Sequence, residues 1–162
     1  MTTPVTKTAM RAEAGQSGEH RDFVTLMVAG QWFGIPVLSV QDVLGPQRIT
    51  RIPLAPREVA GSLNLRGRIV TAIDIRQRLG YPPRDDARAA WSVVVDKGGE
   101  LYSLLFDQVG EVLSLPTSRL ERNLTTIDQS LREVSDGIYR LEDTLLVVLA
   151  VQRLLELKKA AA

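Results

Sequence analysis

Residues Val59–Gly80, VAGSLNLRGRIVTAIDIRQRLG, combine a glycine-containing turn, an apolar strand and the start of a helix within twenty-two residues. The same pattern recurs near the C-terminus. Placing Gly61 over Gly137 aligns five pairs of apolar residues without a gap, namely Leu65 with Leu141, Ile69 with Leu145, Ile73 with Leu149, Ile75 with Val151, and Leu79 with Leu155. The shared apolar positions indicate a repeated structural unit.

The polar residues of this stretch are not repeated. Asn64, Arg66, Gly67, Arg68, Asp74 and Arg76 are replaced in the second copy by Arg140, Glu142, Asp143, Thr144, Ala150 and Gln152. We infer that the apolar frame builds the fold and that the polar residues of the first copy have a local, specialised role.

Two predicted hairpins repeat in the same order as the frame. DFVTLMVAGQWFGIPV (22–37) has a turn expected at Gly30-Gln31, and WSVVVDKGGELYSLLF (91–106) has one around Gly98-Gly99. At an offset of sixty-nine residues, VQDVL (40–44) also aligns with VGEVL (109–113), whereas the frame repeats at an offset of seventy-six. The difference predicts a longer connection in the second copy, within SLPTSRLERNLTTIDQ (114–129).

Short strands with frequent turn signals predict an all-β fold made of small barrels. We expect a flexible tail at residues 1–20, two quasi-repeated barrels at about 21–80 and 91–150 and a proline-containing linker at 80–90. The spacing of Val151, Leu154 and Leu155 predicts a C-terminal helix at 151–159. Two small barrels packed on one another would leave a binding groove at their junction.

The composition excludes several classes of protein. The chain has no cysteine, which excludes disulfide scaffolds and thiolate chemistry and fits a cytoplasmic location. No apolar run reaches the roughly 18 residues that span a bilayer, and the N-terminus has no signal-peptide core.

Motifs for catalysis, cofactors and metals are also missing from the sequence. Its one histidine, His20, lies at the end of the predicted tail and is assigned no role. Neither G-x-x-x-x-G-K-[ST] nor G-x-G-x-x-G occurs, and the pair Asp85-Asp86 falls in the linker. We therefore expect a non-enzyme with no catalytic residues, no cofactor and no metal.

Charge is distributed unevenly along the chain. The net charge is +1, yet residues 48–78 carry seven arginines against two acids, and residues 100–143 carry nine acids against four arginines. Segments of opposite sign suit a protein with different partners on different faces, although solvated surface charge explains them equally well. The basic segment has no aromatic residue for base stacking, so a nucleic-acid-binding tandem barrel is the weaker alternative.

The motif G-x-x-N-L-R-G-x-I-x-x-x-x-D-[IL]-R, which runs here from Gly61 to Arg76, resembles the signature of the CheW family of bacterial chemotaxis coupling proteins. The resemblance extends to VQDVL with RITRIP, to FDQVGEVLSL and to DTLLVVLAVQRLL, and so covers about residues 23–157. It implies two packed, five-stranded SH3-like barrels with short helices.

The resemblance implies a cytoplasmic adaptor that couples the signalling tips of methyl-accepting chemoreceptors to the regulatory domain of the histidine kinase CheA. Other CheW-like domains would join it in rings, and it would meet the membrane only through receptors. A CheW-type adaptor of a non-flagellar pathway is the alternative. The receptor-contacting positions of the family correspond to Val40, Asp42, Arg66, Val109 and Val112. No kinase-binding residue is assigned.

Some of these residues also have structural interpretations. Gly61 and Gly67 suit positions of positive φ or close approach, and Asp74 suits the N-cap of the following helix. Arg66 suits a turn, and the three valines suit a core. Which of the valines face solvent is left open by the sequence.

Overall fold

The computed structural model describes residues 18–83 and 90–156. Its strands are β1 (His20–Val28), β2 (Gln31–Pro36), β3 (Val40–Leu44), β4 (Val59–Leu65), β5 (Arg68–Asp74), β6 (Trp91–Lys97), β7 (Glu100–Phe106), β8 (Gln108–Pro116), β9 (Ser135–Arg140) and β10 (Leu145–Leu149). Its short helices are α2 (Ile75–Leu79), α3 (Gln129–Arg132) and α4 (Val151–Leu154), with 3-10 turns η1 (Val37–Ser39) and η3 (Thr117–Arg119).

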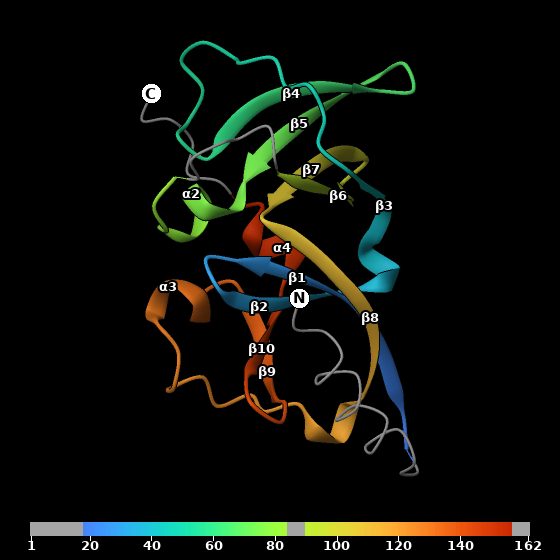
Figure 1. Ribbon diagram of the computed structural model, residues 1–162, viewed down its shortest axis with the longest axis vertical. Coiled ribbons are helices and arrows are strands. Elements are labelled where there is room, and N and C mark those ends of the chain that lie inside the picture. Colours follow the sequence, from blue (N-terminus) through green and yellow to red (C-terminus); the bar gives the residue numbers. More distant parts are fainter. Residues whose placement is uncertain (1–17, 84–89, 157–162) are drawn as a thin grey trace.

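The strands form two five-stranded sheets, which we call the upper and lower barrels after their places in Figure 1. The strand order is β3-β6-β7-β5-β4 in the upper barrel and β8-β1-β2-β10-β9 in the lower barrel. In both, a hairpin occupies the centre, and a parallel pairing joins it to the strand from the glycine-containing frame. The predicted all-β class with two SH3-like barrels and short helices is confirmed.

Each barrel takes strands from both repeats. The first hairpin, β1–β2, lies in the lower barrel with β8, β9 and β10, whereas the second, β6–β7, lies in the upper barrel with β3, β4 and β5. The assignment of one barrel to residues 21–80 and the other to 91–150 is therefore wrong. Both copies carry the same alternation of apolar side chains, so each hairpin can pack on strands of either copy, and the pattern alone does not choose between them.

Strand pairing follows the repeat residue by residue. Val40 pairs with Val95 in the upper barrel, and their equivalents, Val109 and Leu26, pair in the lower barrel. Gly61 pairs with Ala72, and its equivalent, Gly137, pairs with Val148. The two barrels are thus copies in register as well as in strand order.

Each barrel is closed by an isolated bridge, Thr50 with Ser62 above and Glu121 with Ile138 below. The loop spanned by the lower bridge is five residues longer than that of the upper bridge, and it includes α3. The longer connection expected in the second copy therefore lies largely here.

The two bridges require glycine at positions 61 and 137, because a larger residue would collide with the closing segment. A Cβ atom on Gly61 would meet the carbonyl oxygen of Thr50, and one on Gly137 would lie 2.8 Å from the carbonyl oxygen of Glu121. The repeated glycine therefore lets the closing segment approach the frame strand of its barrel.

Three groups of buried apolar side chains hold the molecule together. The largest joins the two barrels and includes Phe33 from β2, Phe106 from β7 and Leu154 from α4. A second group fills the lower barrel around Trp32, and a third fills the upper barrel around Leu63. Because the largest group draws on both barrels, the barrels form one packed body.

Two expected boundaries differ from the structure. The first hairpin turns at Ala29-Gly30, one residue earlier than expected, and both residues have positive φ, as a two-residue hairpin turn of type I′ requires. Helix α4 ends at Leu154, so the predicted helix at 151–159 is too long for the described residues. Arg78 donates from Nε to the carbonyl of Leu154 and so satisfies the helix end without a further turn.

The expected tail falls largely on residues 1–17 and the expected linker largely on 84–89, both outside the described residues. Among residues 18–83 and 90–156, no helix is long and apolar enough to cross a membrane.

Candidate functional site

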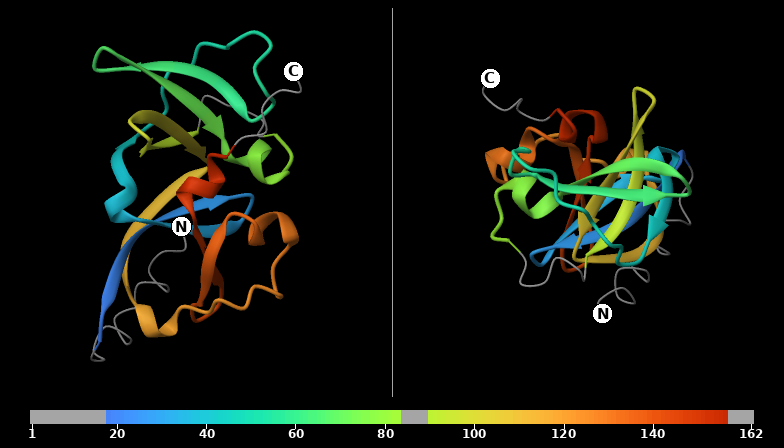
Figure 2. Two further views of the ribbon diagram at one scale, coloured as in Figure 1. Left: turned by 180° about the vertical axis from the view of Figure 1, so that it is seen from behind. Right: turned by 90° about the horizontal axis from the view of Figure 1, so that it is seen from above.

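The two segments predicted to contact a receptor, VQDVL and VGEVL, form β3 and the first half of β8. Each of these strands stands at one end of the strand order of its barrel. They lie on the same side of the molecule, to the right in Figure 1 and to the left in the left view of Figure 2. The structure therefore brings one edge strand from each barrel to a common side.

The three predicted valines divide into two kinds. Val40 and Val109, which are equivalent in the repeat, are half-buried and pack against the apolar group that joins the barrels. Val112 is 58% exposed on β8. Val40 and Val109 therefore have a structural role in addition to any contact with a partner, and Val112 is free to meet one.

The structure adds a fourth valine, Val43, to the three that the sequence predicted. Val43 of β3 is 38% exposed and is the repeat equivalent of Val112, since both pair with a valine of the neighbouring hairpin, Val93 and Val24. The repeat in the sequence already indicates Val43, because Val43 lies sixty-nine residues before Val112. We call Val40, Val43, Val109 and Val112 the valine surface.

Arg66 lies at the tip of the β4–β5 hairpin, in a two-residue turn with Gly67. Both residues have positive φ, 53° for Arg66 and 85° for Gly67, and the amide of Gly67 donates to Oδ1 of Asn64 at 2.9 Å. Asparagine and glycine adopt this conformation more readily than arginine does. The turn thus does not explain the arginine, whose side chain is 80% exposed.

The predicted polar residues Arg66 and Asp42 contact each other. Nη2 of Arg66 lies 3.2 Å from Oδ2 of Asp42, which joins β3 and the β4–β5 turn at opposite ends of the strand order of the upper barrel. Oδ1 of Asp42 accepts from the amide of Val43, whereas Oδ2 is buried and, within the described part of the chain, receives no well-aligned hydrogen bond. This oxygen therefore depends on the Arg66 guanidinium for compensation of its charge.

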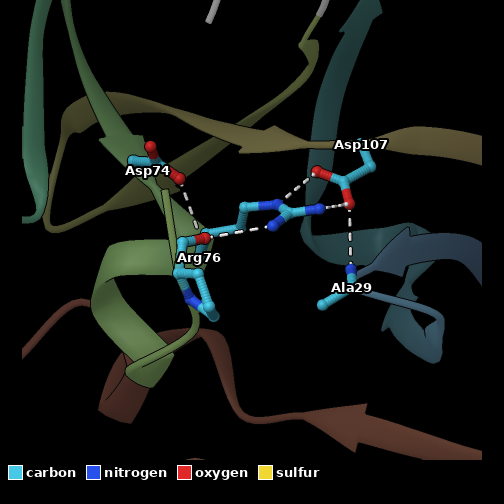
Figure 3. Close-up of polar contacts among 5 residues, drawn as sticks. Ala29, Asp74, Arg76 and Asp107 are labelled. Carbon is cyan, nitrogen blue, oxygen red and sulfur yellow. Dashed lines mark hydrogen bonds and ion pairs between the residues drawn. The ribbon is translucent and has the colours of Figure 1, made fainter. Parts of the chain in front are cut away.

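Asp74 and Arg76, the last polar residues of the signature, lie where β5 passes into α2. Asp74 is the N-cap of α2, and its Oδ1 accepts from the amide of Arg76 at 3.0 Å. The Arg76 side chain extends away from the helix to Asp107, as Figure 3 shows. These two residues therefore act on the structure rather than on the valine surface directly.

None of the hollows described for residues 18–83 and 90–156 is lined by the valine surface. One of them, for example, is lined by the β3–β4 loop, including Arg48 and Arg51. The groove between the barrels stays a prediction. In the same part of the chain, no three histidine, aspartate or glutamate side chains gather as a metal site requires. What the predicted residues offer is an apolar surface with an adjacent ion pair, an arrangement that suits contact with another protein.

Comparison with known proteins identifies the family. The model of the CheW-like domain matches residues 22–159. The chain belongs to the CheW-like domain family. It is 26% identical to the chemotaxis protein CheW of Klebsiella aerogenes, with 87% of this chain and 85% of the relative covered, and 23% identical to that of Helicobacter pylori, with 90% of each covered.

A solved structure of a CheW protein also resembles this chain. The scaffolding protein TtCheW of Thermoanaerobacter tengcongensis matches with a TM-score of 0.76 and 26% identity over 88% of this chain and 92% of that one. The comparisons confirm the resemblance inferred from the signature and support the role of a coupling adaptor.

Proposed function

We propose that this CheW-like protein is a scaffold without a catalytic step that couples chemoreceptor signalling tips to the regulatory domain of the histidine kinase CheA. The observation that carries the proposal is the valine surface, because two edge strands from different barrels carry exposed valines, Val43 and Val112, at equivalent positions. Membership of the CheW-like family supplies the class of partner.

The chemistry of the valine surface suits a receptor tip. A receptor tip is a helical hairpin whose face carries apolar residues at helical spacing, and an amphipathic helix docks by burying that face against apolar side chains. Val43 and Val112 supply exposed apolar contacts, and Val40 and Val109 supply a rigid base fixed to the core. If one receptor tip contacts both strands at once, its affinity depends on how the two barrels are positioned relative to each other.

Arg66 and Asp42 supply the polar anchors. The Arg66 guanidinium is exposed and can bond to a receptor carboxylate or to helix carbonyls in a fixed geometry. When it turns from Asp42 to the receptor, the Asp42 carboxylate loses its compensating charge and would gain from a receptor donor, since Oδ2 receives no well-aligned hydrogen bond from residues 18–83 or 90–156. The two residues would thus exchange their own ion pair for contacts with the partner.

The kinase contacts a different part of the surface in this proposal. Arg48, Arg51 and Arg57 are exposed on the β3–β4 loop of the upper barrel, and much of the acidic segment, residues 100–143, belongs to the lower barrel. Opposite charge on the two barrels favours alternating contacts with the CheA regulatory domain and with other CheW-like domains in rings. The protein would then be located in the cytoplasm, at the receptor array.

Co-purification tests the proposal. The full chain is mixed with a receptor cytoplasmic signalling fragment and CheA, and both complex formation and CheA autophosphorylation are measured. We expect a ternary complex and a higher rate of autophosphorylation than with CheA and receptor alone. Absence of binding to both partners, with the protein folded, would contradict the proposal. Salt-dependent binding to oligonucleotides would instead support the nucleic-acid alternative.

A further inference from the structure

The chain crosses between the barrels at two equivalent points. After β2 it passes through η1 to β3, and after β7 it passes through the single residue Asp107 to β8. In the alignment of the two repeats at an offset of sixty-nine residues, Leu38 of η1 is equivalent to Asp107. Leu38 is 97% exposed, whereas Asp107 is half-buried and held by several groups. The two crossovers are equivalent in position and differ in how they are fixed.

Asp107 is bound by residues of both barrels. Its Oδ1 accepts from Nε of Arg76 at 3.0 Å, and its Oδ2 accepts from Nη2 of Arg76 at 2.7 Å and from the amide of Ala29 at 2.9 Å. Its own amide donates to the carbonyl of Met27. Figure 3 shows the Arg76 side chain reaching from α2 of the upper barrel to the carboxylate, which also contacts the β1–β2 turn of the lower barrel.

Arg76 is itself fixed at both ends. Its amide donates to the N-capping Asp74, and its Nη1 donates to the carbonyl of Pro82 at 3.0 Å. A two-point arginine–carboxylate pair has a defined geometry, and its half-buried position reduces screening by water. We call the group of Arg76, Asp107 and Ala29 the crossover clamp.

The clamp also acts on a strained turn. Ala29 has a φ of 52°, which costs an L-residue free energy, whereas its equivalent in the other hairpin is Gly98, which adopts a φ of 62° without strain. The bond from the Ala29 amide to Asp107 partly offsets that cost. The lower hairpin therefore depends on Asp107 in a way that the upper hairpin does not.

We propose that Arg76 is a positioning residue that fixes β8, and with it Val109 and Val112, relative to the upper barrel. β8 starts directly after Asp107, and Val109 is its second residue. At this end of the strand, Gln108 pairs with Met27 and Val109 pairs with Leu26. A displacement of Asp107 therefore moves the start of β8. The role in receptor docking rests on the proposed function, whereas the effect on β8 does not.

Arg78 provides a matched control on the same helix. It is also half-buried, but it donates to the carbonyls of Leu154 and Arg153 rather than to the crossover. The variants Arg76→Gln, Asp107→Asn and their double variant are compared with Arg78→Gln. Arg76→Lys keeps the positive charge without the two-point geometry, and it serves as the milder variant if the glutamine variant fails to fold.

The first measurement is hydrogen exchange of the amides at the start of β8, residues 108–112. We expect Arg76→Gln to speed their exchange about tenfold relative to Arg78→Gln, because local opening of the clamp releases the strand end. Exchange in the centre of β6, at Val93–Val95, should stay the same in both variants. Equal exchange at residues 108–112 in the two variants overturns the proposal.

The second measurement is affinity for a receptor signalling fragment. We expect Arg76→Gln and Asp107→Asn each to weaken binding about tenfold, with no further loss in the double variant, because either change removes the same ion pair. Additive losses, or an equal loss in Arg78→Gln, overturn the role in docking. If the parent chain binds no receptor, the proposed function fails, and hydrogen exchange still decides whether Arg76 fixes β8.

Discussion

Asn64 and Gly67 hold the hairpin turn that carries Arg66, through the bond from the Gly67 amide to the Asn64 side chain. The turn geometry therefore does not depend on the arginine side chain, which leaves the turn and meets Asp42. An arginine at a position of positive φ, where glycine or asparagine is favoured, indicates a role outside the turn. This separation of fold from site makes Arg66 the most informative position to change.

Replacing Arg66 with alanine should weaken receptor binding by about 2 kcal/mol, as expected for a binding hot spot. The free energy of unfolding should fall by only about 1 kcal/mol, because alanine has the same backbone strain and the guanidinium is exposed, although the buried Oδ2 of Asp42 loses its compensating charge. Arg66→Gly is the matched variant, and it should be about 0.5 kcal/mol more stable than Arg66→Ala, because glycine relieves the strain of the positive φ, while weakening binding equally. Titration calorimetry with a receptor fragment and urea unfolding measure the two effects. Unchanged affinity in both folded variants would contradict the role of Arg66.

Gly67→Val should destabilise the protein by roughly 2 kcal/mol, because a β-branched residue is strained at a φ of 85°. A Cβ there meets no atom within 4 Å, so the loss comes from the backbone conformation and not from a clash. Gly67→Asn is the control and should be tolerated, since asparagine accepts this conformation. Equal melting temperatures of the valine variant and the parent would refute the explanation.

Gly61→Ala should destabilise the protein by about 3 kcal/mol, more than Gly67→Ala does, because its Cβ would meet the carbonyl oxygen of Thr50 in the bridge that closes the upper barrel. Both positions have positive φ, so both alanine variants carry backbone strain, and only the Gly61 variant adds a steric contribution. Urea unfolding of the two variants measures it. Similar losses at both sites would show that the close approach carries little free energy.

Val112→Asp should lower receptor affinity at least about tenfold and change the free energy of unfolding by less than about 0.5 kcal/mol, since the side chain is largely exposed. Leu54→Asp is the control, because it introduces the same charge at a fully exposed leucine of the β3–β4 loop, which belongs to neither β3 nor β8. Receptor affinity and urea unfolding are measured for both. An equal loss of affinity in the two variants would show that the added negative charge, and not the position of Val112, weakens binding.

Alkaline pH should destabilise the lower barrel through Tyr139. Burial raises the pKa of its phenol above the usual 10.0, and the positive charges of Arg21 and Arg122 oppose this in part. Because the folded-state pKa is higher than the unfolded one, the stabilisation is complete below pH 10 and is lost as pH rises through the folded-state pKa. Thermal unfolding from pH 8 to 11 should show a smaller loss of stability for Tyr139→Phe than for the parent. Identical pH profiles would exclude this contribution.

The sequence predicted the fold class and the register of the repeat, because alternating apolar residues specify which faces are buried. It did not predict which hairpin joins which barrel, since exchanging the two hairpins buries the same kinds of side chain. The ion pair of Arg76 with Asp107 was also missed, because its members belong to different copies and no periodicity relates them. The resemblance to the CheW family points to Asp42 and Arg66 separately, whereas their contact with each other depends on the closed barrel, which no sequence pattern encodes.

The exchange of hairpins between the copies also has a consequence for synthesis on the ribosome. β3 to β7, which make up the upper barrel, are complete once residue 106 has left the exit tunnel, but β1 and β2 await β8, β9 and β10. Until residue 149 emerges, the first hairpin exposes apolar strands with unpaired edges, a state that favours aggregation. β1 and β2 thus precede the upper barrel in the chain but complete their own sheet after it, and their hairpin needs protection during that interval.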